Sequence, residues 1–304
     1  MKNWNILYPL LIGVTVLICS LMVWALPEYL FVIVPGIVAI PVVLFIVEME
    51  KKRPFKAIWN EKKKDQKADL IRTFLTLPTA LKAGEWITPI LFYYPLVYIQ
   101  SHVLDFGTNF PIWLEVITLL LISEFFFYWI HRWSHEKESL WIFHAIHHGA
   151  ERVYWGNAGR FHFVDAFLTG LAYAIPIVVF SPSKEAIVVL LTLSAVSGFM
   201  EHINIRFHAG IWNYVFNTAE LHRWHHSEEV EESNTNYGKI LVVWDLVFGT
   251  HYYAKNQSPV RVGVKNEKVP TTYFEQTVYP FRLLNDQTTP LKSRSDLVGK
   301  EATN

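Results

Sequence analysis

Long stretches of this chain carry no charged side chain, and they limit what it can fold into. The segments 6–26, 29–47 and 86–104 contain no Asp, Glu, Lys or Arg, and 112–130 contains only two acidic residues. A helix needs about 20 apolar residues to cross a bilayer. Segments 166–180 and 186–200 are also uncharged but shorter, so they either span or re-enter the membrane. We therefore expect an all-α integral membrane protein with four to six transmembrane or re-entrant helices.

The composition agrees with this class and excludes others. Of 304 residues, 52% are hydrophobic and only 18% are charged, with a formal net charge of zero. No basic patch is interleaved with aromatic residues, so we do not expect nucleic-acid binding. The sole cysteine, Cys19, lies in the first apolar segment, which excludes a disulfide framework or a thiolate metal site. That segment is too long for a signal peptide and is followed at once by another, which indicates a retained hairpin.

Ten of the thirteen histidines fall in a pattern that suits metal binding. They form one H-x-x-x-H pair, two H-x-x-H-H clusters and two single residues, namely His131 and His135, His144, His147 and His148, His222, His225 and His226, and finally His162 and His202. On a helix, residues three or four apart share a face, so each cluster can direct its imidazoles at one point. Neutral imidazole suits zinc, copper, iron and nickel. Because one metal seldom takes more than about six ligands, ten histidines predict two metals close together.

The remaining histidines, His102, His208 and His251, are expected to be ordinary packed or surface residues. The H-E-x-x-H motif of zinc proteases does not occur in the sequence, which excludes that class. A membrane protein that stores or transports metal is an alternative to an enzyme. It would place its ligands along a path through the bilayer, whereas these histidines follow or precede the apolar segments.

The distribution of basic residues predicts on which side the histidines lie. Residues 48–85 hold ten Lys and Arg, whereas the turns near Glu28 and Asp105 hold none. Basic residues concentrate on the cytosolic side of membranes. Counting spans from there brings all ten clustered histidines to the cytosolic face, in a helical cap. We expect a transmembrane hairpin over 1–50, a basic cytosolic linker over 51–85, the metal-binding domain over 86–254 and a polar tail over 255–304.

Five strings of residues resemble the fatty acid hydroxylase / sterol desaturase superfamily. They are FFFYWIHRWSH, LWIFHAIHH, GRFHFVD, ELHRWHH and NYGKILVVWDLVFGT, which begin at residues 125, 140, 159, 220 and 236. Members of that family are integral membrane, non-haem di-iron oxygenases. The resemblance implies that the eight histidines of the three clusters are ligands, with His162 and His202 as further ones. It covers roughly 86–253. The family's His-Pro is here His162-Phe163, although the acid at Asp165 is kept.

The resemblance also implies a reaction. Two iron ions and dioxygen would hydroxylate or desaturate a C–H bond of a lipid, such as a sterol or fatty acyl chain. The electrons would come from a separate cytochrome b5, ferredoxin or reduced pterin, because no dinucleotide-binding motif is present. The active site would lie on the cytosolic face of the membrane. That membrane would be the endoplasmic reticulum in a eukaryote or the inner membrane in a bacterium. Ether-lipid cleavage with a reduced pterin, as in alkylglycerol monooxygenases, is the alternative activity.

No catalytic residue beyond the metal ligands is predicted. Metal-bound histidines usually donate their second N–H to a carboxylate or carbonyl. The acids close to the histidine clusters in sequence are candidates for this role, namely Glu124, Asp165, Glu201, Glu220 and Asp245.

Overall fold

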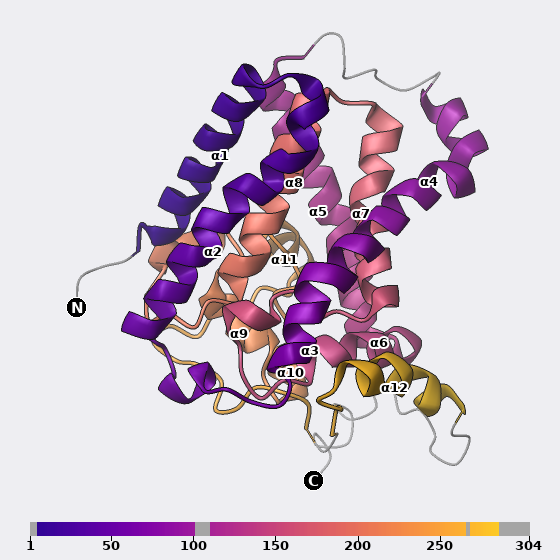
Figure 1. The fold of residues 1–304 in the computed structure, drawn as a ribbon. Helices are drawn as coiled ribbons and strands as arrows, with labels where there is room; N and C mark the ends of the chain where they lie inside the picture. The colour runs from indigo at the N-terminus through magenta and orange to yellow at the C-terminus, as the bar shows by residue number, and fades with distance from the viewer. Residues whose placement is uncertain (1–4, 101–109, 266–267, 286–304) are drawn as a thin grey trace.

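Six long helices form the upper part of the molecule in the computed structural model, which describes residues 5–100, 110–265 and 268–285 (Figure 1). Their bounds are α1 Leu7–Ala25, α2 Val34–Lys52, α4 Leu77–Gln100, α5 Ile112–Glu136, α7 Phe163–Phe180 and α8 Lys184–Glu201. The described residues contain no β-strand, only three isolated β-bridges. This confirms the predicted all-α class.

Short helices and loops gather at the opposite end from the turn that joins α1 to α2 (Figure 1). The short helices are α3 Gln66–Ile71, α6 Glu138–His148, α9 Ala219–His225, α10 Val230–Ser233, α11 Val243–Phe248 and α12 Tyr273–Asn285. A helix needs far fewer than 20 residues to form part of such a cap, whereas the long helices match the thickness of a bilayer. We refer to this lower layer as the cap.

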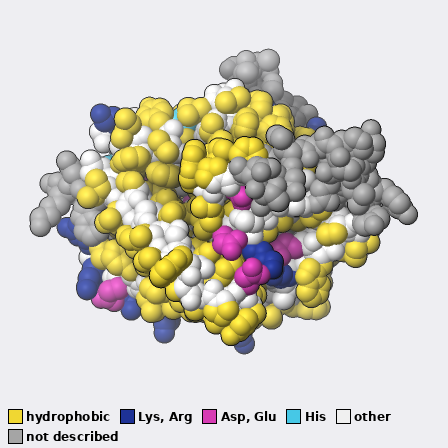
Figure 2. Space-filling view, turned by 90° about the horizontal axis from the view of Figure 1, so that it is seen from above, with side chains coloured by type: hydrophobic (Ala, Val, Ile, Leu, Met, Phe, Trp, Pro, Cys, Tyr) yellow, Lys and Arg dark blue, Asp and Glu magenta, His cyan; other side chains and the backbone are white. Residues whose placement is uncertain are grey.

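Four helical stretches are long and apolar enough to cross a membrane, among the described residues. They are Leu7–Ala25, Glu28–Lys52, Ile112–Glu136 and Phe163–Phe180. Large apolar side chains such as Trp24 and Ile90 are 87% and 76% exposed, as lipid-facing residues would be. Figure 2 shows the end opposite the cap, where most of the visible side chains are hydrophobic and few are charged.

Helix α8 lies at the centre of the bundle and packs against α1, α2 and α5. Its buried residues Val189, Leu193 and Val196 belong to one continuous apolar cluster with residues of α1 and α2. Because α8 is enclosed on several sides, its low charge reflects burial in protein as well as membrane contact. Its N-terminus is capped by Ser183, whose side chain in turn donates to the buried carboxylate of Glu115.

Two glycines allow α4 and α7 to approach closely. A β-carbon added at Gly84 would lie 2.8 Å from the carbonyl oxygen of Phe167, and one added at Gly170 would lie 2.7 Å from that of Leu81. Small residues at helix contacts are typical of membrane proteins, where close backbone approach replaces the hydrophobic effect as the source of association. This contact holds the N-terminal half of α7, which carries Asp165, next to the cap.

The helix boundaries differ in places from the apolar segments. Helix α4 begins at Leu77 rather than at residue 86, because Lys82 and Glu85 are tolerated on its exposed surface as an ion pair. The expected end of that segment, 101–104, lies outside the described residues. The segment 51–85, which was expected to be a linker, also contains helices. Helix α3 is followed by a π-helical segment, Arg72–Thr76, that leads directly into α4.

Candidate metal centre

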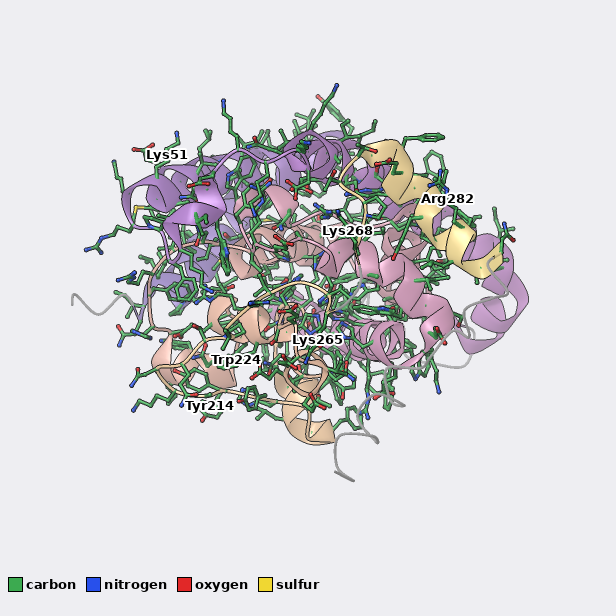
Figure 3. All side chains as sticks on the ribbon, turned by 90° about the horizontal axis from the view of Figure 1, so that it is seen from below. Lys51, Tyr214, Trp224, Lys265, Lys268 and Arg282 are labelled. Carbon is green, nitrogen blue, oxygen red and sulfur yellow. The ribbon has the colours of Figure 1, made fainter. Side chains whose placement is uncertain are left out.

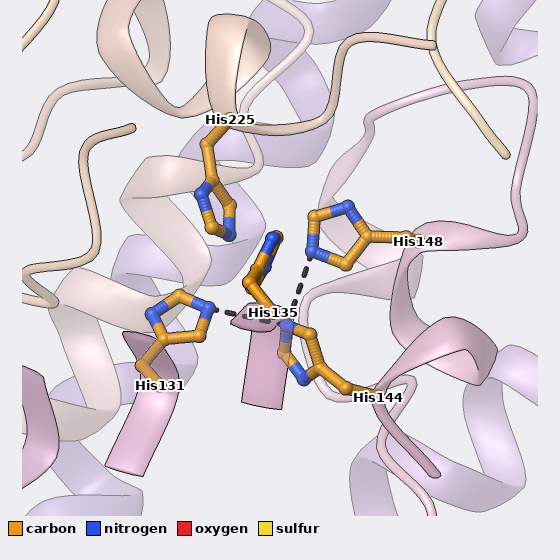
Figure 4. A group of neighbouring side chains, drawn as sticks. All are labelled: His131, His135, His144, His148 and His225. Atoms are coloured by element: carbon orange, nitrogen blue, oxygen red, sulfur yellow. Dashed lines mark hydrogen bonds between the residues drawn. The ribbon is translucent and has the colours of Figure 1, made fainter. Parts of the chain in front are cut away.

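Nine of the ten predicted histidines meet in the cap. They come from the end of α5, from α6, from the residue after α8, and from α9 and the residue that follows it. They form a five-membered group (His131, His135, His144, His148 and His225) and a four-membered group (His147, His202, His222 and His226). Within each group one ring nitrogen per residue lies within 4.8 Å of all the others, and all nine side chains are buried. Figure 4 shows the five-membered group.

The two H-x-x-H-H clusters are each divided between the groups. His144 and His148 belong to the five-membered group, while His147, between them, belongs to the other. In the same way, His222 and His226 share one group and His225 turns to the other. At 3.6 residues per turn, the fourth residue after a histidine lies about 40° to one side of it and the third about 60° to the other side, so the two can be directed at different groups. Each cluster therefore connects two neighbouring sites.

Oxygen acceptors fix the orientation of five imidazoles. His131 Nδ1 donates to the carbonyl of Tyr237 over 2.7 Å, and His225 Nδ1 donates to the carbonyl of Thr235 over 2.8 Å. Three side chains accept from the others, namely Asp165 from His144 at 2.8 Å, Asn157 from His202 at 2.9 Å and Asn234 from His135 at 3.3 Å. A carbonyl or carboxylate oxygen can only accept, so in each neutral ring the proton sits on Nδ1. The Nε2 lone pairs are left to face the centre.

These lone pairs converge more closely than neutral rings alone would favour. Nε2 of His144 lies 3.2 Å from Nε2 of His131 and 3.1 Å from Nε2 of His148 (Figure 4). Because the protons of His131 and His144 are held on Nδ1, no proton lies between their Nε2 atoms. The buried Nε2 of His225 also has no hydrogen-bond partner among the described residues. A cation bound between them would relieve this repulsion, so the five-membered group fits a metal ion.

Ring nitrogens also converge in the four-membered group, but fewer of its rings are oriented by oxygen acceptors. Nε2 of His222 lies 2.9 Å from that of His202 and 3.0 Å from that of His226. Nδ1 of His147 and of His222 has no hydrogen-bond partner in the described part of the chain. The chain therefore does not select the tautomer of these two rings, and a bound metal would do so.

Burial favours the neutral form of His148, His202 and His226. It lowers the pKa of His202 to about 3. Burial, together with neighbouring imidazoles, holds the pKa of His148 and His226 well below the usual value. Neutral imidazole is the form that binds metals, because only an unprotonated nitrogen has a lone pair to donate.

Two buried carboxylates hold the loop that orients His131. Asp245 accepts from the backbone N–H groups of Tyr237 and Gly238 at 2.7 and 2.8 Å. Glu124 accepts from the next three N–H groups, those of residues 239–241, at 2.9 to 3.1 Å. Five consecutive amides are thus bound by side chains instead of by secondary structure. This arrangement fixes the carbonyl of Tyr237, which accepts from His131.

The other candidate acids do not touch the histidine groups. Glu201 accepts from the side chain of Asn217 over 3.3 Å. Glu220 accepts from the backbone of Ala209 and pairs with His208, which is half exposed. Asp165 is thus the candidate acid with a direct hydrogen bond to one of the nine histidines.

His162 lies apart from both groups. Its Nδ1 accepts from the backbone of Val164 at the start of α7, and its Nε2 donates to the carbonyl of Thr277 in α12 over 3.1 Å. Both ring nitrogens are therefore occupied by the protein backbone. Of the isolated histidines, His251 donates to the carbonyl of Asn213, and His102 lies outside the described residues.

A buried ion cluster attaches the basic segment to the cap. Arg152 and Arg160, in the loop after α6, contact Asp65 at 2.6 and 3.1 Å, and Arg160 also contacts Asp69 of α3 at 2.7 Å. Arg160 donates further to the carbonyl of Ile146, which lies between the histidines of α6. Paired and hydrogen-bonded charges are the form in which charge is tolerated inside proteins. The sequence predicted no role for these four residues, although Arg160 lies within the string GRFHFVD. It also predicted none for Asn157, Asn234 or the two backbone carbonyls.

Comparison with known proteins places the metal centre within a described family. Residues 116–250 match the family model described as fatty acid hydroxylase. The chain is 30% identical to the ornithine lipid hydroxylase OlsE of Rhizobium tropici over 274 residues, which cover 88% of this chain and 78% of that protein. No solved structure matches.

Two further relatives align with less than half of this chain. Alkylglycerol monooxygenase of Homo sapiens is 29% identical over 45% of this chain and 30% of its own length. The Delta(7)-sterol 5(6)-desaturase ERG3A of Gibberella zeae is 30% identical over 43% of this chain and 36% of its own length. The chain therefore spans about a third of each of these two proteins.

Proposed function

Because this chain belongs to the fatty acid hydroxylase family, we propose that it is a membrane-bound di-iron oxygenase that hydroxylates a C–H bond of a lipid. The observation that carries the proposal is the division of nine buried histidines into two adjoining groups with converging nitrogens. Each group would bind one iron ion through nitrogen ligands. His162 is left out of the proposed ligand set, because both its nitrogens are bound by backbone groups.

Iron would supply what the side chains lack, which is the ability to bind and reduce dioxygen. The residues of the chain position the ligands. Asp165 and the carbonyl of Tyr237 hold His144 and His131 in the tautomer that binds metal. Burial excludes bulk water from the centre, which protects a reactive oxidant from side reactions. In the overall reaction one oxygen atom enters the alcohol and the other leaves as water, with two electrons and two protons consumed.

A membrane acyl lipid is the substrate class we propose. One relative, which aligns with 88% of this chain, is an ornithine lipid hydroxylase. The sterol desaturase aligns with less than half of it, so we place hydroxylation before desaturation. The electrons would come from a separate donor, a cytochrome b5, a ferredoxin or a reduced pterin. The apolar helices above the cap would hold the alkyl chain with its target carbon facing the metal centre.

Cytosolic orientation of the cap is also part of the proposal. The segment 48–85 is rich in Lys and Arg, and its residues Asp65 and Asp69 are ion-paired to the loop after α6. The basic segment and the histidines are thus at the same end of the bundle, which supports the cytosolic side for both. A tag at Asn304 and one near Lys63 should both be reached from the cytosol, whereas a label at Thr108 should be reached from the other side. Tags at 63 and 304 on opposite faces would contradict it.

The domain limits follow the same reasoning. We propose a membrane hairpin over 1–50 and a catalytic region over 86–254. Segment 51–85 would attach to the cap instead of acting as a spacer, because it supplies two buried acids, Asp65 directly before α3 and Asp69 within α3.

Metal analysis of single variants tests the assignment of two sites. Purified protein should hold close to two irons per chain. His225→Ala should reduce the iron bound by the five-membered group, and His202→Ala that of the four-membered group, because losing one ligand typically costs about 10–100-fold in affinity or activity. The exposed His208→Ala is the matched control and should keep both irons. Full occupancy in both ligand variants would rule out the assignment.

Activity distinguishes the proposal from its alternatives. Oxygen uptake should require both a reductant and a long-chain lipid, and should be coupled to a hydroxylated product found by mass spectrometry. The alkylglycerol monooxygenase relative favours one alternative, in which an ether lipid is cleaved with a reduced pterin. Release of an aldehyde from an ether lipid only when the reductant is a reduced pterin would support that activity. Bound metal with no oxygen uptake under any combination of reductant and lipid would indicate a metal-binding protein without enzymatic function.

A further inference from the structure

Polar contacts along one side of α12 attach it to the rest of the cap. The buried Arg72, in the π-helical segment, donates to the side chain of Gln276 over 2.7 Å and to the carbonyl of Tyr273 over 3.2 Å. His162 donates to the carbonyl of Thr277 over 3.1 Å. Gln276 and Pro280 are buried on this side. These contacts define which face of α12 is turned toward the protein.

The outward surface of α12 is divided lengthwise into an apolar and a polar flank. Phe274 is 71% exposed, and Phe281 and Leu284 follow it seven and ten positions later with 46% and 45% exposure. Residues seven positions apart lie on nearly the same side of a helix. The exposed Glu275 and Arg282 are also seven positions apart. Each directly follows one of the two phenylalanines, so it lies about 100° further around the helix. The helix thus has three faces: one against protein, one apolar and one charged.

Exposed apolar residues continue from α12 to the membrane-facing bundle. Phe74 and Leu75, in the π-helical segment that binds α12, are 58% and 60% exposed. That segment leads into α4, where Trp86 and Ile90 are 74% and 76% exposed. Figure 1 shows α12 crossing the lower end of the molecule beside α6, and Figure 3 places it at the rim of the lower face, where Arg282 is labelled. The helix that carries the apolar flank therefore lies at the edge of the molecule and not at the centre of the cap.

We propose that α12 lies in the membrane interface, with Phe274, Phe281 and Leu284 inserted among the lipid acyl chains and Arg282 at the phosphate level. A helix of this kind lies in the plane of the interface with its apolar face buried by about 5–10 Å. Aromatic residues favour this depth, and a long arginine side chain reaches the headgroups. The cap is then attached to the bilayer at a second place, on the side of α4 and α7. This inference rests on the membrane fold and not on the proposed reaction.

Fluorescence quenching at single labelled positions tests the proposal. The sole native cysteine, Cys19, is fully buried, so a Cys19→Ala protein is a suitable background. An environment-sensitive fluorophore is attached to Phe274→Cys, to Leu284→Cys and, as the control on the charged flank, to Arg282→Cys. Each protein is placed in phosphatidylcholine vesicles with brominated acyl chains. We expect loss of fluorescence at 274 and 284 and no loss at 282.

Other occupants of this flank give different results. Quenching of 274 and 284 by aqueous iodide instead of by brominated lipid would mean that the flank faces water and would overturn the proposal. Protection of both positions from both quenchers would mean that a protein surface covers them, such as an electron donor or a second copy, and would overturn it equally. Equal quenching by lipid at 282 would refute the assignment of the two flanks. Circular dichroism and metal content of the labelled proteins establish that each is folded.

Discussion

Nδ1 of His144 lies 2.8 Å from Oδ2 of Asp165, and both side chains are buried. The contact joins α6, which carries three of the nine clustered histidines, to the first turn of α7. A carboxylate that accepts from the outer nitrogen of a metal-binding imidazole fixes the tautomer and makes the inner nitrogen a better donor. Asp165 is therefore a positioning residue for His144.

Replacing Asp165 by Asn should weaken metal binding more than it weakens the fold. The amide preserves the shape and can still accept through its oxygen, but its charge is lost. We expect about a 10–100-fold reduction in iron affinity or in lipid hydroxylation, measured by metal titration and by product formation. Glu151→Gln, which changes a highly exposed carboxylate elsewhere in the cap, is the control. Unchanged affinity in Asp165→Asn would contradict the positioning role.

Replacing His162 by Ala should leave the metal content unchanged. Both its ring nitrogens are bound to backbone groups, and its removal breaks the contact with Thr277 of α12. Activity should fall by less than about tenfold, which corresponds to under roughly 1.4 kcal/mol on the barrier. Loss of one iron per chain would instead place His162 among the ligands. His225→Ala, treated in parallel, indicates what loss of a proposed ligand does.

A methyl group added at Gly170 should disrupt the contact between α4 and α7. The new β-carbon would lie 2.7 Å from the carbonyl oxygen of Leu81, which is backbone and cannot rotate away. We expect a lower thermal midpoint for Gly170→Ala, with a loss of about 1–3 kcal/mol as is typical of overpacking. Gly13→Ala in α1 is the matched control, because no atom lies within 4 Å of its added β-carbon. Equal midpoints for the two variants would exclude a tight contact at Gly170.

The metal-free protein should lose stability as the pH falls below about 6.5. The pKa of His202 is lowered to about 3 by burial, and the pKa values of His148 and His226 are also held well below normal. The unfolded chain therefore binds protons near pH 6.5 while the folded chain does not. Stability is fully present above that pH and declines toward acid, by up to about 1.4 kcal/mol per pH unit for each such histidine. Thermal midpoints from pH 8 to 5 after chelation measure this.

The exposed His208 provides the control for that experiment. Its side chain is 53% exposed, so His208→Gln should leave the slope of the pH dependence almost unchanged. His202→Gln should reduce the slope, because it removes one of the buried groups. A midpoint independent of pH between 7 and 5.5 would contradict burial of the histidines in the metal-free state.

Much of the fold could be predicted from local sequence. Segments without charge predicted the long helices because crossing a bilayer requires about 20 apolar residues wherever they occur in a chain. Helix α4 begins at Leu77, before the uncharged segment 86–104, because the Lys82–Glu85 pair interrupts the apolar pattern without ending the helix. Helix α12 was not predicted, because its apolar residues are interrupted by polar ones and by Pro280, and the segment leads into a polar end.

The histidine spacing predicted a metal-binding site but not how the candidate ligands are divided between two groups. Spacing of three and four residues is a local property of a helix, and it places His144 and His148 on one face. Which other imidazoles meet that face depends on how α5, α6, α8 and α9 pack, and only the tertiary structure decided it. The same holds for the carbonyls of Tyr237 and Thr235, because every residue has such an acceptor and no side chain marks the two that are used.

The sequence by itself determined that this is a helical protein with long apolar helices and histidine clusters suited to metal binding, because residue type and short-range spacing suffice for both. The tertiary structure decided which nine histidines meet and that His162 is bound by backbone groups instead. It also decided that Asp165 contacts an imidazole of the two groups, whereas Glu220 pairs with the exposed His208. These outcomes depend on contacts between residues far apart in the chain. Such contacts are set by the packing of whole helices, which the residues next to each histidine do not encode.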